Sequence, residues 1–547
     1  MGDAGLRSAL PGGRVPDEQH RVQHRRQLQP RQLLEPRGRQ SHLGIDLRPR
    51  RAGARRRGHA DRRGTARAVA ADAGYSRRVE GHPERPARDL QRAAQLHLLA
   101  RAVVLHRGAE ITPVRALRSF AATAVDSAAI DPGSIAAEDA AAVRALARDA
   151  RVLAVGEAAH SVADVQTVQD LIVRALVQDP DEDAAPFAAV AIESGFAECL
   201  ALDAWVGGAG SDADLDAVAR DGMTYGFGAS PQVQRMLAGL RDWNLAHPER
   251  RVRVIGIDLP GSSTSPGPAV RACLARIPAL PGDAELLRRA DLGGRTEAAI
   301  ALDRMDPAER ADLIAAIRGL IERVRAQDDG IARRAAASLD AFLDELDFVD
   351  GPGPDGAPRA YPRERFMADT VRWIAERHGR TILLAHNSHV RRTPLHGRPT
   401  LGSLLAAEPG SAYRAIATSY AYGPLVRFEQ RSPRPFDCDV LLDHRGPVPG
   451  SLEAALERVL PAPETAGAES VAVLLSFDAG VDGDPELAEL LAGASGILAG
   501  GELDPVDDFP AAFDAVVHLR EANRVPGAFE RLRTEFGLGT PDAKEQP

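Results

Sequence analysis

The chain has 547 residues, of which 44% are hydrophobic and 27% are charged, and its formal net charge is −9. This composition is typical of a globular protein and excludes a fibrous or wholly disordered chain. No run approaches the ~18 consecutive apolar residues of a membrane-spanning helix, so we expect no membrane partner, and the length suffices for about two to four domains.

The first 110 residues differ from the rest because arginine dominates them. They hold 24 Arg against 11 Asp and Glu and show no sustained apolar period. Such segments bury too little apolar surface to offset the entropy of ordering, so residues 1–110 are predicted to be a disordered extension. We favour a start codon assigned too far upstream as its origin. The alternative is a nucleic-acid-binding arm, but this segment has only Tyr75 for base stacking, so a nucleic-acid partner is not expected.

The three cysteines indicate a reducing environment. Cys199, Cys273 and Cys438 are odd in number and widely spaced. This spacing fits neither a disulfide framework nor a zinc site with closely spaced ligands. We therefore expect a cytoplasmic protein.

From residue 111 to residue 530, strand-like apolar runs alternate with helical stretches. The runs are apolar throughout rather than at every second position, which indicates strands covered on both faces. The alternation predicts an α/β domain with a mostly parallel sheet flanked by helices. The runs span residues 151–156, 186–194, 251–258, 381–387, 412–423, 471–477 and 512–519.

Residues 284–347 interrupt this alternation because their pattern is helical throughout. Asp306, Pro307 and Glu309 mark one helix start, as an N-cap, a first helical residue and a capping-box acid. We predict an inserted helical subdomain over residues 284–347 and a disordered tail over residues 531–547.

Acidic residues and histidines follow four of the apolar runs. Ligands of an open parallel sheet bind beyond the carboxyl ends of its strands, so these residues are predicted to meet at one edge. They are Glu157 and His160 after the first run, Glu193 after the second, Asp258 after the third, and His386 and His389 after the fourth.

Most of these residues also have a purely structural interpretation. Glu157 could lie in the first turn of the next helix, where the helix dipole favours acids. Asp258 could form a turn, and His389 could lie in a loop. Glu193 is harder to explain in this way, because a carboxylate on a buried strand needs a partner. The set as a whole favours a functional site.

Three kinds of chemistry use such residues. A serine nucleophile is poorly supported, because the sequence contains no G-x-S-x-G motif. Histidines and carboxylates also suit zinc or manganese, but there is no HExxH motif. Activation of water by a histidine fits best, because an imidazole beside a carboxylate accepts a proton near neutral pH. Glu157 lies three residues before His160, so both can face one pocket from a first helical turn.

Five segments resemble the erythromycin esterase family, and the resemblance covers about residues 112–525. GEAAHS (156–161) is similar to G-E-A-T-H-G of that family, and AHNSHV (385–390) is similar to its H-N-x-H-V. Three further segments occur in the same order as in the family: AIES (191–194), IGID (255–258) and RERFMADTVRWI (363–374).

The resemblance implies a hydrolase of esters or lactones that uses no cofactor, no obligatory metal and no covalent serine. It implies that His160 is the general base on water and that Glu157 orients its ring. His386 and His389 would hold the substrate carbonyl or its oxyanion. The other residues expected to bind the substrate are Glu193, Asp258 and Arg363.

The chain departs from the family pattern at Ala159, where the family has Thr, and at Gln169, where it usually has a cation. Two alternatives therefore stand beside a hydrolase that uses histidine-activated water. One is a metal-dependent hydrolase or transferase with the same pocket, and the other is a non-catalytic binding protein. The expected partner is a small ester or lactone, macrolides included, and Tyr225 and Phe227 are candidate lining residues.

Overall fold

The structure is a computed structural model, and the predicted basic extension of residues 1–110 lies outside the residues that it describes. These are residues 114–117, 137–179, 185–349, 351–353, 356–432, 434, 436–458, 460, 472–477 and 485–538.

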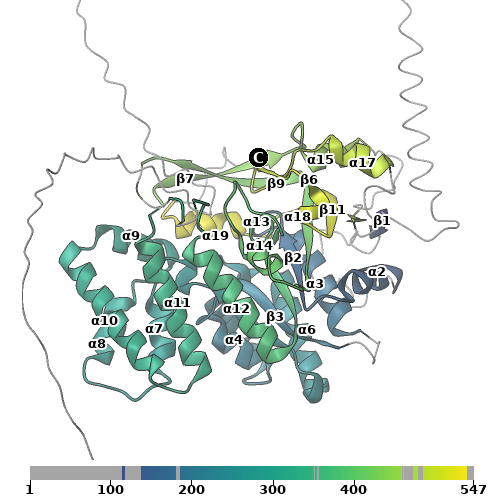
Figure 1. Ribbon diagram of the computed structural model, residues 1–547. Helices are drawn as coiled ribbons and strands as arrows, with labels where there is room; N and C mark the ends of the chain where they lie inside the picture. Colours follow the sequence, from purple (N-terminus) through teal and green to yellow (C-terminus); the bar gives the residue numbers. More distant parts are fainter. Residues whose placement is uncertain are drawn as a thin grey trace, which may run out of the picture. The chain divides into compact units, whose positions relative to one another are not determined.

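A nine-stranded sheet runs through the described part of the chain (Figure 1), with the strand order β1-β8-β11-β6-β2-β5-β3-β4 and with β7 paired to β6. Neighbouring strands from β11 to β4 in this order are parallel. The predicted α/β class with a mostly parallel sheet is therefore confirmed. The strands are β1 (Val114–Leu117), β2 (Val152–Glu157), β3 (Phe187–Gly195), β4 (Arg253–Asp258), β5 (Arg380–His386), β6 (Tyr413–Gln430), β7 (Cys438–Arg445), β8 (Ala472–Ser476) and β11 (Ala515–Glu521).

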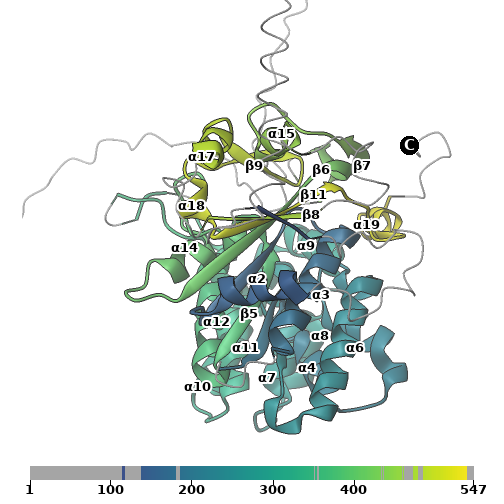
Figure 2. The same ribbon diagram turned by 90° about the vertical axis from the view of Figure 1, so that its right-hand side faces the viewer.

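Both faces of the parallel strands are apolar and buried. Successive side chains of a strand point to opposite faces: in β2, Leu153 and Val155 belong to one core cluster, and Ala154 belongs to the other. Helices cover each face (Figures 1 and 2). This double coverage explains why the strands are apolar at every position.

Two groups of helices form the layers on these faces. The Leu153 face is covered by α2 (Ala137–Ala147), α3 (Ala163–Val177), α4 (Cys199–Val206) and α6 (Pro231–Ala246). The Ala154 face is covered by α7 (Gly267–Leu274), α10 (Pro307–Arg325), α11 (Gly330–Leu346), α12 (Pro362–His378) and α14 (Leu401–Ala406).

The segment predicted as a helical insertion, residues 284–347, consists of α8 (Asp283–Ala290), α9 (Arg295–Arg304), α10 and α11. The Asp306 side chain accepts hydrogen bonds from the backbone amides of Ala308 and Glu309 at 2.9 and 3.3 Å, and Pro307 is the first residue of α10. The helix therefore begins where its capping residues predict. Helix α11 packs against α7, α10 and α12, which joins the insertion to the main core.

The sheet is less uniformly parallel at one edge than we predicted. The run at residues 471–477 forms β8, which pairs antiparallel with both β11 and β1. The run at residues 412–423 continues as β6 to Gln430 and forms an antiparallel hairpin with β7. A second, two-stranded sheet contains β9 (Gly496–Ala499) and β10 (Glu502–Pro505).

The predicted disordered tail is wrong for residues 531–538. Residues Ala528–Glu535 form helix α19. Phe529 and Phe536 pack against Cys438 and Val440 of β7, so burial of apolar side chains holds this helix in place. Residues 539–547 of the predicted tail lie outside the described residues.

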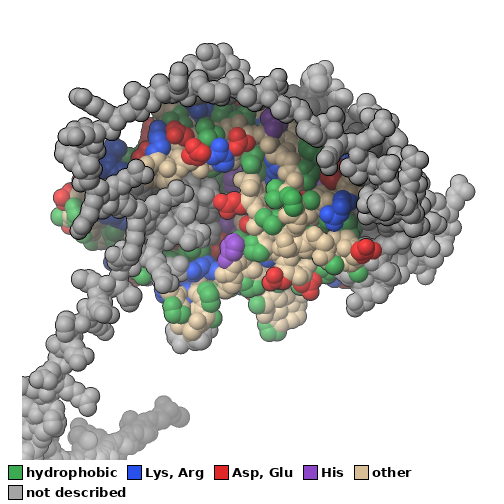
Figure 3. All heavy atoms as spheres, turned by 90° about the horizontal axis from the view of Figure 1, so that it is seen from above, with side chains coloured by type: hydrophobic (Ala, Val, Ile, Leu, Met, Phe, Trp, Pro, Cys, Tyr) green, Lys and Arg blue, Asp and Glu red, His purple; other side chains and the backbone are tan. Residues whose placement is uncertain are grey.

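Among the described residues, no helix is long and apolar enough to span a membrane. On the face shown in Figure 3, acidic and basic side chains lie close together.

Candidate active site

The order of the strands brings four predicted strand ends together. Strand β5 lies between β2 and β3, and β4 lies next to β3. Glu157, the last residue of β2, pairs in register with His386, the last residue of β5. Glu193 and Asp258 lie at the carboxyl ends of β3 and β4. Residues far apart in the sequence thus meet at one edge of the sheet.

Gly156 allows β2 and β5 to approach each other at this edge. A Cβ atom added to Gly156 would lie 2.0 Å from Oδ1 of Asn387. Nδ2 of Asn387 donates to the Thr418 carbonyl at 2.7 Å, and its Oδ1 accepts from the Thr418 amide at 3.2 Å. These bonds tie the end of β5 to β6 and fix the backbone next to His386.

The His160 ring contacts the Glu157 carboxylate from the turn between β2 and α3. Nδ1 of His160 lies 2.9 Å from Oε1 of Glu157. The predicted first helical turn is wrong, because Glu157 ends β2 and α3 begins only at Ala163. Ser161, with a φ of 61°, reverses the chain after the ring. The side chain of His160 is 29% exposed, against 7% for Glu157, so solvent reaches the ring.

The electrostatic environment of His160 favours its protonated form. Burial lowers the pKa of His160, but the carboxylates of Glu157 and Glu193 outweigh this effect, and the net result is a raised pKa. Burial also raises the pKa of Glu157, and His160 opposes that rise. Because the carboxylate occupies Nδ1, Nε2 is the atom of His160 that can exchange a proton with a ligand.

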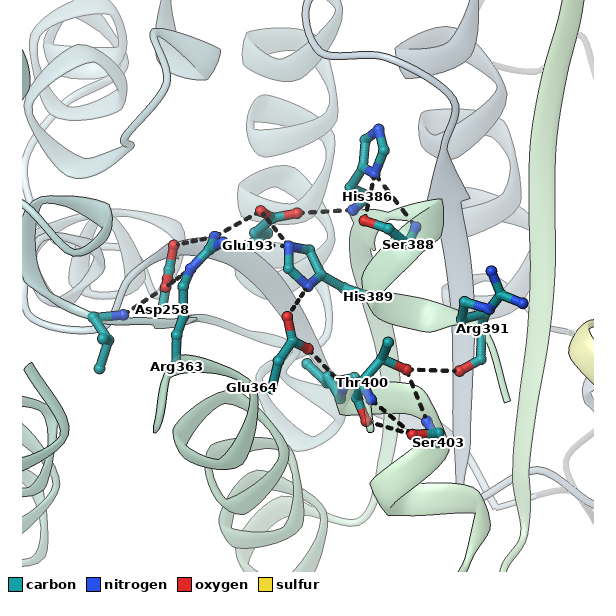
Figure 4. Close-up of polar contacts among 12 residues, drawn as sticks. Glu193, Asp258, Arg363, Glu364, His386, Ser388, His389, Arg391, Thr400 and Ser403 are labelled. Atoms are coloured by element: carbon teal, nitrogen blue, oxygen red, sulfur yellow. Dashed lines mark hydrogen bonds and ion pairs between the residues drawn. The ribbon is translucent and has the colours of Figure 1, made fainter. Parts of the chain in front are cut away.

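His386 is a neutral imidazole beside His160, with 5.4 Å between the two ring centroids. Burial and the neighbouring His160 lower the pKa of His386 to about 3. Nδ1 of His386 accepts from the Ser388 amide at 3.3 Å and lies 2.8 Å from the Ser388 hydroxyl oxygen. With Nδ1 as an acceptor, the single ring proton is on Nε2. Figure 4 shows the His386 ring pointing away from Glu193 and His389.

A buried cluster of charges lies behind these two histidines. Arg363, in the first turn of α12, donates to Oε1 of Glu193 at 2.9 Å and to both carboxylate oxygens of Asp258 at 2.8 Å (Figure 4). Burial lowers the pKa of Arg363, but Asp258 outweighs it and holds that pKa well above its usual value. For Glu193, burial raises the pKa, but His389 and Arg363 lower it well below the usual range.

The predicted direct contact of Arg363, Glu193 and Asp258 with a substrate is not what the geometry favours. Their side chains are 5%, 3% and 0% exposed, respectively. Their charged groups are occupied by one another, and their contact with a substrate stays a prediction. Oε2 of Glu193 accepts from the backbone amide of His386 at 2.8 Å, which ties this cluster to the end of β5.

His389 belongs to the same buried cluster and not to the pocket surface. Its Nδ1 lies 2.6 Å from Oε1 of Glu364, and its Nε2 lies 3.3 Å from Oε1 of Glu193. Burial lowers the pKa of His389, but the two carboxylates outweigh it and raise that pKa to about 10. Both ring nitrogens of this imidazolium face carboxylates, and the contact of His389 with a substrate oxygen stays a prediction.

Tyr225 and Phe227 stand next to His160, with ring centroids 4.9 and 5.3 Å from the His160 centroid. The Tyr225 hydroxyl oxygen accepts a hydrogen bond from Nη2 of Arg363 at 2.9 Å. Burial raises the pKa of the Tyr225 phenol above its usual value, which keeps its proton in place at neutral pH. Tyr225 has a φ of 58°, a costly backbone conformation for a bulky side chain.

A comparison with family models decides the family of this chain. The model described as erythromycin esterase matches residues 184–522. The chain belongs to the erythromycin esterase family. Erythromycin esterase type II of Escherichia coli is 24% identical to it over 279 residues. That match covers 46% of this chain and 64% of the relative, so the chain spans less than two thirds of the relative's length.

Two solved structures share the fold. A succinoglycan biosynthesis protein is 15% identical, with a TM-score of 0.57, and the match covers 79% of this chain and 98% of that one. A mutant of the erythromycin esterase EreC in its open conformation is 19% identical, with a TM-score of 0.54, and the match covers 75% of this chain and 98% of that one.

The erythromycin esterase match includes only part of the site. It covers Glu193, Asp258, Arg363 and both histidines of the AHNSHV segment, but it begins after Glu157 and His160. The relation of GEAAHS to the family therefore rests on the motif and on its place in the structure, where Glu157 pairs with His386.

Two polar residues of the site had no clear signal in the sequence. Glu364 pairs with His389 and accepts from the Leu401 amide at 2.7 Å. Ser388 contacts Nδ1 of His386 through its amide and its hydroxyl. Gln169, where the erythromycin esterase family usually has a cation, is buried, and its Nε2 donates to the Gly156 carbonyl at 3.3 Å.

Proposed function

We propose that this chain hydrolyses a carboxylic ester or lactone bond with a water molecule activated by His160. The observation that carries the proposal is the 2.9 Å contact between Nδ1 of His160 and the Glu157 carboxylate, in a ring that is still 29% exposed. A carboxylate behind an accessible imidazole is the arrangement of a general base.

The reaction starts when Nε2 of His160 takes a proton from water. The water oxygen bonds to the carbonyl carbon of the substrate, and the carbonyl oxygen becomes an oxyanion. When this intermediate collapses, the bond between the carbonyl carbon and the leaving oxygen breaks. The proton then passes from His160 to the leaving oxygen. The products are a carboxylic acid and an alcohol. When the substrate is a lactone, both groups belong to a single hydroxy-acid product.

Two neutral donors are suited to the oxyanion. Nε2–H of His386 is one, because His386 has a pKa of about 3 and its proton stays on Nε2. In this structure the Ala158 backbone accepts from the ring, so the oxyanion would replace that acceptor. The Tyr225 hydroxyl is the other, because its oxygen accepts from Arg363 and its own proton is left to donate. Each donor of this kind contributes roughly 10²-fold to 10³-fold in kcat. Both are uncharged before the reaction, so neither attracts an anion in place of the ester carbonyl.

A metal-dependent mechanism in the same pocket has less support. Within the described residues, no group of three or more His, Cys, Asp and Glu side chains is arranged to hold a metal ion. His389 instead pairs with both Glu193 and Glu364. A chelator distinguishes the two mechanisms, because only the metal-dependent one predicts that chelation abolishes turnover.

The test is a screen of 4-nitrophenyl esters, lactones and macrolides with the wild type and with His160→Ala. We expect turnover by the wild type, before and after chelation, and a loss of about 10²-fold or more in His160→Ala. His444→Ala, which removes an exposed histidine of β7, is the matched control and keeps its activity. Unchanged turnover in His160→Ala rejects the mechanism, and ligand binding without any turnover indicates a binding protein instead.

A further inference from the structure

Arg295 is a partly buried cation that the proposed reaction does not use. It is the first residue of α9, in the helical insertion, and its side chain is only 9% exposed. Nε of Arg295 donates to Oε1 of Glu535 in α19 at 2.9 Å. That carboxylate is shared, because the Thr296 hydroxyl donates to the same oxygen at 3.3 Å.

The guanidinium of Arg295 lies over the aromatic residue that borders His160. Its Cζ is 4.9 Å from the centroid of the Tyr225 ring and 5.4 Å from that of the Phe436 ring. The Tyr225 ring is in turn 4.9 Å from the His160 ring. The cation is therefore within 10 Å of the proposed general base, with one aromatic ring between them.

The hydrogen-bonding capacity of Arg295 is largely unused. A guanidinium has five N–H donors, and among the described residues only Glu535 accepts from this one. Arg363 differs, because Glu193, Asp258 and Tyr225 all accept its hydrogen bonds. Neither Nη atom of Arg295 is among the buried side-chain atoms that lack a partner. With no acceptor among the described residues, both Nη groups reach solvent, so a ligand can reach them as well.

We propose that Arg295 forms an anion subsite, and that the substrate is an ester or lactone carrying a carboxylate on the part that extends past Tyr225. The planar fork of a guanidinium matches a carboxylate with two parallel hydrogen bonds. The Tyr225 and Phe436 rings both contact the guanidinium through cation–π interactions, which hold it in place beside the His160 pocket. This inference rests on the proposed hydrolase function and specifies its substrate class.

The test compares two esters that differ only at the end of a six-carbon acyl chain. They are 4-nitrophenyl hexanoate, which is neutral, and the 4-nitrophenyl half-ester of adipic acid, which ends in a carboxylate. We expect the ratio of kcat/KM for the anionic ester over the neutral ester to fall about tenfold or more in Arg295→Gln. Arg295→Lys, which keeps the charge, should retain a larger ratio than Arg295→Gln.

The matched control is Arg304→Gln, which removes an exposed arginine at the other end of the same helix. Its ratio should equal that of the wild type. A ratio in Arg295→Gln within twofold of the wild type overturns the subsite. Thermal unfolding of each variant shows whether it is folded. If Arg295→Gln does not fold, the ratio of kcat/KM values is compared between the wild type and Arg295→Lys instead.

A binding measurement separates failure of the subsite from failure of the hydrolase proposal. If the wild type cleaves neither ester, calorimetry with adipamate, a monoanion, and with hexanamide, its neutral counterpart, still tests Arg295. Adipamate should bind the wild type about tenfold more tightly than Arg295→Gln, with no such difference for hexanamide. Equal affinities of the two proteins for adipamate overturn the subsite independently of catalysis.

Discussion

Glu157 and His386 end two neighbouring parallel strands and pair with each other in register. This pairing sets the ring of His386 5.4 Å from that of His160, which Glu157 holds. The pKa values of the two imidazoles move in opposite directions: that of His160 is raised, and that of His386 falls to about 3. Separated pKa values at one site indicate separate roles, here a base and a neutral donor.

The Glu157 carboxylate should set the pH dependence of the reaction. The base form of His160 exists only above its pKa, which is raised from the ordinary 6.5. The kcat/KM of the wild type should therefore rise with pH through a midpoint above 6.5. In Glu157→Gln, the carboxylate that raises the pKa of His160 is gone, whereas the burial that lowers this pKa remains. The midpoint should therefore move down by about one pH unit or more. The maximal kcat should fall about tenfold because the ring loses its orientation.

The measurement is kcat/KM for 4-nitrophenyl hexanoate from pH 5 to 9. Glu502→Gln, an exposed carboxylate of β10, is the control and should give the profile of the wild type. An unchanged midpoint in Glu157→Gln would show that Glu157 does not act on the titrating group.

His386 should contribute to the rate without contributing to the pH profile. With a pKa of about 3, it carries no charge from pH 5 to 9, the range of the assay. His386→Ala removes the Nε2–H donor and should lower kcat about 10²-fold at every pH. His386→Gln, whose amide is also a donor, should lose less. A large shift of the midpoint in either variant would contradict the assignment and indicate that His386 titrates during the reaction.

The sequence predicts most of the strands and the strand-end residues, because both are local patterns. The parallel strands are apolar on both faces, as in Leu153, Ala154 and Val155 of β2, and this double burial is visible in the residues themselves. The direction of β8 is not visible in its residues, because an antiparallel strand covered on both faces has the same apolar pattern as a parallel one.

The roles within the site depend on distant partners and could not be predicted in the same way. His389 is a buried imidazolium only because Glu364 of α12 and Glu193 of β3 both reach it. Nothing near the AHNSHV segment reveals those partners. Tyr225 was recognisable as a candidate lining residue, but its hydrogen bond from Arg363 depends on how residues 223–230, which precede α6, fold against α12.

The His389–Glu364 pair should stabilise the fold in a pH-dependent manner. The pKa of His389 is about 10 in the folded state and about 6.5 when unfolded. Its contribution to stability is therefore complete below pH 6.5 and is lost as the pH rises towards 10. At pH 6.5, Glu364→Gln should lower the free energy of unfolding by about 3 kcal/mol, because it leaves a buried charge with one partner fewer.

Denaturant unfolding of the wild type and Glu364→Gln from pH 6.5 to 9.5 measures this effect. The difference in the free energy of unfolding between the two proteins should shrink as the pH rises. Titratable groups that behave alike in both proteins do not affect this difference. Glu408→Gln removes the carboxylate of an exposed ion pair with Arg372 and should change stability by less than about 1 kcal/mol. A difference that is constant over the whole range would mean that His389 is not the linked group.

The contact between Gly156 and Asn387 should be the reason that β2 needs a glycine before Glu157. In Gly156→Ala, the new Cβ meets Oδ1 of Asn387 at 2.0 Å and must displace it. We expect a loss of about 1–3 kcal/mol in the free energy of unfolding.

Asn387→Ala alone should also destabilise the fold, because it removes two hydrogen bonds to Thr418. In the double variant the clash is gone, so the combined loss should be smaller than the sum of the two single losses. Strictly additive losses would show that another neighbour, such as the Ile416 carbonyl at 3.3 Å, imposes the glycine instead.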